Sequence, residues 1–148
     1  MKKILAFLLL AVLVSCTGEA EEPKKKVEAQ PEELIEIKDG VYTEWYPGKK
    51  QIKFRGPQDE QKRRNGVWYF YSEGGQELSV TMYEHGMRTG HSVVKYPNGV
   101  LHYRGEYAND KMVGVWTTYD ESGKMISEVT YDQEGKMISQ KTAEEGTK

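Results

Sequence analysis

Residues 90–131 read GHSVVKYPNGVLHYRGEYANDKMV and then GVWTTYDESGKMISEVTY, and this stretch decides the fold. The two blocks share three marks: an opening glycine, a second glycine nine residues later, and a tyrosine eight residues after that. The marks are Gly90, Gly99 and Tyr107 in the first block and Gly114, Gly123 and Tyr131 in the second. One unit of 24 residues has been copied, so the stretch predicts a repeat protein.

The same frame continues toward the N-terminus. The next copy upstream holds Gly66, Gly75 and Tyr83, and the first copy holds Gly40 and Gly48, with Gly56 in the tyrosine position. Extra length in residues 56–65 predicts a longer loop there. Downstream, a fifth copy begins at 134–138 and stops where Ser139 replaces the expected glycine. We therefore predict a repeat domain over residues 38–139 and a polar tail over 140–148.

Within each copy, the residue pattern predicts a β-hairpin. Aromatic and β-branched residues, which strands favour, fill residues 67–71 and 115–119. A second strand with apolar residues at alternate positions follows each turn, as in residues 100–107. Glycines between the strands supply the positive φ that hairpin turns need. We assign this turn role to Gly40, Gly48, Gly66, Gly75, Gly90, Gly99, Gly114 and Gly123.

Successive hairpins with short links predict an all-β fold, an antiparallel meander of about eight to nine short strands. The second copy departs from the others. Leu78, Val80 and Met82 have the opposite parity relative to Gly75, which predicts a β-bulge or an altered turn in that copy.

Three segments of this repeat resemble the bacterial variant of the MORN repeat (membrane occupation and recognition nexus). They are residues 66–71 (GVWYFY), 96–99 (YPNG) and 114–119 (GVWTTY). The resemblance covers residues 40–138 and implies an array of β-hairpins without a shared catalytic residue. It also implies kinship with proteins that are often described as antitoxin-like. The chain departs from the family pattern at Asp110, in place of a turn glycine, and at Ser92, in place of a tryptophan.

The N-terminus has the pattern of a secretion signal. Met1-Lys2-Lys3 precedes an apolar run, Ile4 to Val14, that fits the helical core of a signal peptide and is too short to span a bilayer. The residues LVSC at 13–16 resemble the lipobox of bacterial lipoproteins. This resemblance implies a signal peptide over 1–15, cleavage between Ser15 and Cys16, and diacylglycerol on the Cys16 sulfur. A plain signal peptide with an incidental free thiol is the alternative.

Residues 16–37 predict a flexible tether behind the lipidated cysteine, because Glu, Lys, Ala and Pro dominate them. Alternatively, Leu34, Ile35 and Ile37 form a short turn or strand that docks on the first repeat. Acyl chains on Cys16 would hold the chain at a lipid bilayer without a transmembrane helix. The expected location is the bacterial cell envelope. The outer membrane, on its periplasmic or surface side, is allowed because Thr17 rather than aspartate follows the cysteine.

Charge and motif content argue against nucleic-acid binding and catalysis. The formal net charge is −2, whereas nucleic-acid binders present a basic surface, so we expect no nucleic-acid partner. His85, His91 and His102 are expected in turns or on strand surfaces, and their spacing does not gather the ligands of a zinc site. No nucleophile elbow, phosphate-binding glycine loop or zinc-protease helix is present. We predict no catalytic residue, no metal and no cofactor.

The aromatic residues suggest how the repeats could bind a partner. Trp68, Tyr71, Trp116 and Tyr119 form the candidate binding surface, with packing inside the sheet as the alternative. We therefore predict a non-enzymatic binding or structural module at the cell envelope, with a protein partner. An antitoxin- or immunity-like protein that neutralises one partner is the alternative function, and an envelope hydrolase is a third.

Overall fold

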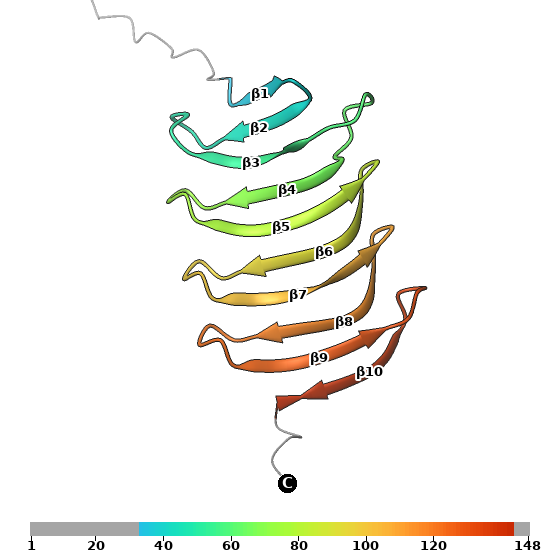
Figure 1. Ribbon diagram of the computed structural model, residues 1–148. Helices are drawn as coiled ribbons and strands as arrows, with labels where there is room; N and C mark the ends of the chain where they lie inside the picture. Colours follow the sequence, from blue (N-terminus) through green and yellow to red (C-terminus); the bar gives the residue numbers. More distant parts are fainter. Residues whose placement is uncertain (1–32, 144–148) are drawn as a thin grey trace, which may run out of the picture. The chain divides into compact units, whose positions relative to one another are not determined.

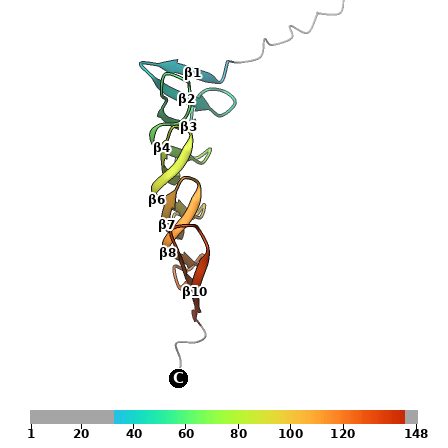
Figure 2. The same cartoon turned by 90° about the vertical axis from the view of Figure 1, so that its right-hand side faces the viewer.

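The computed structural model describes residues 33–143, which form one antiparallel sheet of ten strands (Figure 1). The strands follow one another across the sheet in sequence order, from β1 to β10. Viewed from the side, the sheet is a single layer, and within the described residues no helix or second sheet covers either face (Figure 2). The predicted all-β, antiparallel meander is confirmed.

The strands differ in length. Their bounds are Ile35–Lys38 (β1), Val41–Trp45 (β2), Ile52–Pro57 (β3), Gly66–Tyr71 (β4), Glu77–Glu84 (β5), Met87–Lys95 (β6), Leu101–Ala108 (β7), Lys111–Tyr119 (β8), Met125–Tyr131 (β9) and Met137–Thr142 (β10).

The sheet extends beyond the predicted repeat domain at both ends. At the N-terminal end, β1 overlaps the segment 16–37 predicted as a tether, and it pairs with β2 through Ile35 opposite Glu44 and Ile37 opposite Tyr42. The alternative given by the sequence, a short strand that docks on the first repeat, is therefore correct for these residues. At the C-terminal end, β10 runs to Thr142, past the predicted boundary at 139. Unpaired backbone at a sheet edge can recruit a flanking polar segment, which the repeat pattern does not register. The predicted signal peptide, 1–15, lies outside the described residues.

Several hairpins close with a turn that ends in glycine; three of these turns lie on one side of the sheet, and the one between β9 and β10 lies on the other side. Four turns share one pattern: the glycine N–H donates to a carbonyl three residues back, and the next residue accepts a bond from that same starting residue. These turns begin at Ser72, Tyr96, Asp120 and Asp132. The pattern is a turn followed by a glycine bulge, and a register shift accompanies each one. The second copy has the same bulge as the other copies, so a bulge peculiar to it does not explain the opposite parity of Leu78, Val80 and Met82.

The other kind of turn has two residues, both with positive φ. These turns are Asp39-Gly40, His85-Gly86 and Asn109-Asp110. This geometry matches the right-handed twist of paired strands. Asp110 tolerates its φ of 66° because short polar side chains accept the left-handed conformation better than branched ones do.

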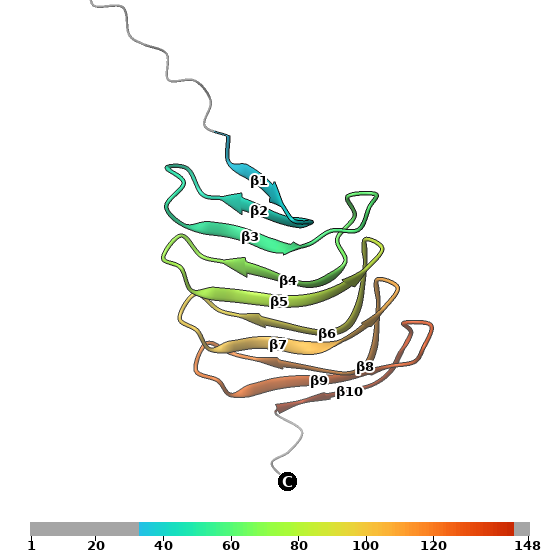
Figure 3. The same cartoon turned by 45° about the horizontal axis from the view of Figure 1, so that its top comes forward.

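Three of the predicted turn glycines do not lie in turns. Gly66, Gly90 and Gly114 have positive φ but belong to strands β4, β6 and β8. Near Gly90 and Gly114, the register with the preceding strand shifts, and the paired strand ends bend away from the plane of the sheet (Figure 3). A bulge of this kind redirects a strand, which explains the glycine at these positions.

The core lies on one face of the sheet, where an indole ring covers a glycine. Trp116 is 4% exposed, and a Cβ atom on Gly105 would overlap its ring. Tyr103 and Tyr107 flank the indole at centroid distances of 5.9 and 4.8 Å. The indole N–H donates to the carbonyl of Glu106 at 3.1 Å, so the polar end of the ring is satisfied.

The same contact recurs two repeats earlier. Trp68 is also 4% exposed, a Cβ atom on Gly56 would overlap its ring, and its N–H donates to the carbonyl of Pro57 at 2.8 Å. In the repeat between them, Ser92 stands in the tryptophan position and Thr81 in the glycine position. Their hydroxyl groups lie 2.9 Å apart, so a hydrogen-bonded pair replaces the indole and its glycine.

Replacing Gly105 by alanine should lower the free energy of unfolding by about 3 kcal/mol, because the new methyl group displaces the Trp116 ring. Urea denaturation of the full chain measures the change. Gly74→Ala is the matched control, since its Cβ would meet only Ser72 Oγ at 3.7 Å, and it should cost less than about 1 kcal/mol.

A double variant separates steric overlap from a general intolerance of side chains at this position. Gly105→Thr with Trp116→Ser copies the natural Thr81–Ser92 pair. The double variant should lose at least about 1 kcal/mol less unfolding free energy than the two single variants lose in total. Simple additivity would contradict the indole-over-glycine account.

Candidate functional site

The strand register divides the side chains between two faces. One face, the aromatic face, holds Trp68, Trp116 and the tyrosines beside them. The opposite face carries a continuous row of cross-strand partners, here called the transverse row. The transverse row runs Thr43, Arg55, Tyr69, Val80, Val93, Arg104, Thr117, Glu128 and Lys141, from β2 to β10.

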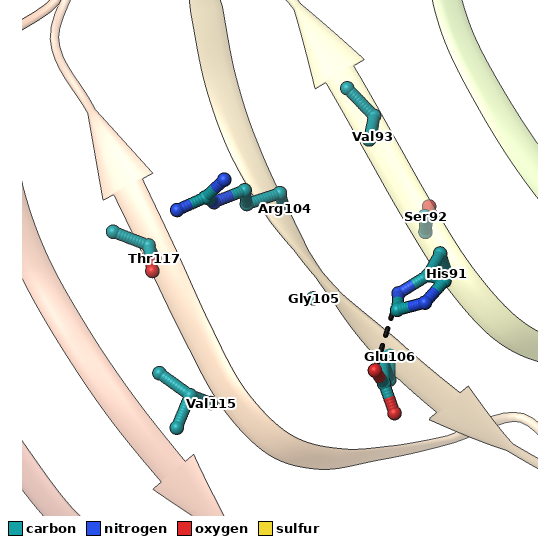
Figure 4. A pocket seen from close by; sticks show the side chains of 8 residues that line it. All are labelled: His91, Ser92, Val93, Arg104, Gly105, Glu106, Val115 and Thr117. Atoms are coloured by element: carbon teal, nitrogen blue, oxygen red, sulfur yellow. Dashed lines mark ion pairs between the residues drawn. The ribbon is translucent and has the colours of Figure 1, made fainter.

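A hollow of about 410 Å³ opens on the opposite face (Figure 4). Side chains from β6, β7 and β8 line it. His91 and Glu106 form an ion pair at 3.2 Å beside it, while Arg104 stands apart from that pair (Figure 4). Val115 presents 51% of its surface to solvent at the same place. The hollow therefore offers an exposed apolar contact next to charged hydrogen-bonding groups.

A second hollow of about 420 Å³ lies on β1, β2 and β3. Its lining includes Val41, Thr43 and Arg55, which lead into the transverse row. The two hollows therefore contain the two arginines of the row, one at each site.

The groups around these hollows are suited to binding. The His91 and Glu106 side chains are 76% and 52% exposed, so their ion pair is solvated and weak. No group of three or more His, Cys, Asp or Glu side chains among residues 33–143 is placed to hold a metal ion. An exposed surface of mixed charge and apolar contact makes hydrogen bonds and buries area against a partner.

The aromatic face has a smaller hollow of about 290 Å³ beside Trp116. Arg88 lies 4.1 Å from the Tyr107 ring centroid and forms an ion pair with Asp110 at 2.8 Å. The hydrogen bond to Asp110 raises the pKa of Arg88, and the same bond lowers the pKa of Asp110. Burial raises the pKa of the Tyr107 hydroxyl. The ion pair holds the two-residue turn Asn109-Asp110 against β6.

The predicted binding residues do not form one surface. Trp68 and Trp116 are buried in the core, which is the alternative given by the sequence, and they offer no exposed contact area. Tyr71 and Tyr119 are half-buried, and their carbonyls accept hydrogen bonds from the Tyr46 and Tyr96 hydroxyls. The Tyr71 ring stacks on Tyr69, which belongs to the transverse row on the opposite face.

Sequence reasoning missed Arg55, Arg104 and Val115. Alternation along each strand placed Arg104 on the wet face, but only the register shows which residues become its neighbours. His102 lies on the same face of β7 as Arg104, as alternation predicts, but it is half-buried, with its ring 4.2 Å from the Tyr96 ring. The other two histidines are exposed, as predicted, with His85 in a turn.

The long loop at 58–65 is fastened by an acidic side chain. Asp59 accepts a hydrogen bond from Arg63 Nε at 2.8 Å, and His85 Nδ1 lies 3.2 Å from the same carboxylate. The Arg63 hydrogen bond holds the pKa of Asp59 well below its usual range. The next arginine, Arg64, covers the Trp68 ring at 4.5 Å. The loop therefore closes one end of the aromatic core.

Residues 88–109 and 112–133 match the MORN repeat variant. The first MORN repeat carries the hairpin β6–β7, and the second carries β8–β9. Both MORN repeats contribute to the hollow in Figure 4, because His91 and Arg104 come from the first and Val115 from the second. No curated protein matches the chain. A MORN-repeat module indicates a binding or structural role.

Residues 33–143 contain no helix with the length and hydropathy needed to cross a bilayer.

Acid should weaken the loop anchor. Because the pKa of Asp59 is lower in the folded chain than in the unfolded chain, its stabilisation is present above the usual aspartate pKa of about 3.9 and is lost as pH falls below it. Asp59→Asn should therefore reduce the loss of unfolding free energy between about pH 5 and pH 3. Urea titrations at the two pH values measure it.

Asp59→Asn should remove only part of the acid sensitivity of the unfolding free energy, since the pKa values of Asp110 and Asp120 are lowered too. Glu60→Gln is the matched control, because the structure shows no side-chain hydrogen bond for Glu60 within the described loop. An equal acid sensitivity of the wild type and Asp59→Asn would rule out this role for Asp59.

Proposed function

We propose that this chain is a lipid-anchored protein of the bacterial cell envelope whose MORN-repeat sheet binds a protein partner. The anchor is Cys16, preceded by the apolar run and the lipobox-like residues 13–16. Acyl chains on that sulfur supply membrane affinity without a transmembrane helix. The sheet begins at Ile35, so a short segment separates the anchor from the binding module.

One observation carries the binding role: the opposite face combines an exposed valine, a hollow and a free arginine. Val115 is half-exposed, and Arg104 has no ion pair or hydrogen bond within residues 33–143. An array that only spaced other parts apart would not need an apolar side chain beside an unpaired guanidinium. Protein interfaces, by contrast, are enriched in arginine and bury apolar area.

Cys16→Ala should move the protein from the membrane fraction to the soluble fraction, because the lipid attachment site is lost. Immunoblots of fractionated cells, with a gel-mobility shift as a second readout, measure the change. Ser15→Ala is the matched control, since it keeps a small residue before the cysteine and should leave the distribution unchanged. Full membrane retention of Cys16→Ala would refute the anchor.

A photo-crosslinking residue at position 115 should give one discrete protein adduct in intact cells. The same residue at Ile138, which is 65% exposed at the β10 edge, is the control and should not give that adduct. Identical adducts from both positions would argue against the opposite face as the binding surface. A partner that is toxic when produced alone would give this module a neutralising role.

A further inference from the structure

Part of the transverse row has arginines at both ends and apolar side chains between them. This segment, here called the strip, consists of Arg55, Tyr69, Val80, Val93 and Arg104 on β3 to β7. We propose that the strip docks an extended segment of a protein partner that carries two carboxylates separated by apolar side chains. The inference rests on the proposed function, because it names the chemistry of the partner at that same face.

The charge balance of the row leaves both arginines without a partner. The transverse row contains three cations and one carboxylate, and that carboxylate, Glu128, lies 3.6 Å from Lys141. Arg55 and Arg104 are exposed and have no ion pair or hydrogen bond within the described residues. Glu106, the nearest acidic residue along β7, pairs with His91. Two carboxylates from outside would complete the pairing, and arginine binds a carboxylate with two parallel hydrogen bonds.

The spacing of the strip sets the spacing of those carboxylates. Four strand steps separate Arg55 from Arg104, which is about 19 Å at a strand separation of about 4.8 Å. An extended chain covers about 3.3 Å per residue, so the two acidic residues would be about six positions apart. Residues at an even spacing lie on the same side of an extended segment. The two intervening residues on that side would then meet the apolar middle of the strip.

The apolar middle favours a peptide over other anions. Tyr69, Val80 and Val93 are half-buried and contribute side-chain area that a carbohydrate phosphate or a nucleic-acid backbone would not cover. The row crosses five strands, so the bound segment lies across the sheet and does not extend its edge. Docking therefore depends on side chains of the strip, and substitution can test each of them.

Fluorescence anisotropy with a labelled synthetic peptide tests the proposal, using the full chain purified in detergent. The probe peptide is Glu-Ser-Val-Ser-Leu-Ser-Glu with blocked ends. We expect Arg55→Gln and Arg104→Gln each to raise its Kd at least about ten-fold, because each removes one charge-assisted contact. Lys141→Gln is the matched control, a cation in the same row that already has Glu128, and it should change Kd less than about two-fold.

Two further peptides test the spacing and the apolar middle. Moving the second glutamate to two positions after the first should weaken binding about ten-fold, because one arginine loses its partner. Replacing Val and Leu by serine should weaken it further, since the apolar contact is lost. Circular dichroism confirms that each variant of the protein remains folded.

Several results would overturn the strip. These are no binding at millimolar peptide, equal Kd for the wild type and both arginine variants, or equal Kd for all peptides. Arginine-dependent binding of phosphatidylglycerol vesicles with no peptide binding would show that the strip binds a membrane surface instead of a peptide. Arginine-dependent self-association in sedimentation experiments would show that the strip binds a second copy of the chain instead. A crosslink at position 115 without peptide binding would keep the proposed function and reject only the strip.

Discussion

This sheet depends on one kind of contact, in which an indole ring packs flat over a glycine of the neighbouring strand. A single-layer sheet has no second layer to bury its apolar residues, so burial must come from side chains on the same face. Trp116 and Trp68 achieve this because Gly105 and Gly56 leave space for the rings and tyrosines close around them. Where the indole is absent, Ser92 and Thr81 fill the space with a hydrogen bond, which keeps the strand spacing without a large side chain.

The two kinds of turn keep this contact in register along the array. From β4 to β9, turns that end in glycine and a bulge alternate with two-residue turns on the other side of the sheet, and the bends near Gly90 and Gly114 redirect the strands between them. As a result, each of the two tryptophans meets a glycine of the preceding strand: Trp116 meets Gly105, 11 residues before it, and Trp68 meets Gly56, 12 residues before it across the longer loop. The opposite face inherits the same register, and this is what assembles the transverse row from residues far apart in the sequence.

Much of the architecture could be predicted from the sequence, because each turn leaves a glycine at a regular interval. The meander and the hairpins follow from that interval. Contacts across strands could not be predicted in the same way. The role of Gly105 depends on the Trp116 indole, which reaches it through a register shift. Arg104 is left without an ion pair within the described residues because Glu106 pairs with His91. The sequence predicts β1 only as an alternative to a flexible tether, because no turn glycine precedes its four residues.

Every strand is bonded only to the strands that precede and follow it in the sequence, and β1 stands at one end. Mechanical load on the N-terminal segment therefore reaches β1 first and passes to the middle of the sheet only through each strand pair in turn. Such an arrangement yields by peeling: β1 parts from β2 before the tryptophan contacts bear any force. Elasticity of this kind lets the end nearest the load open and re-zip while the distant repeats stay folded.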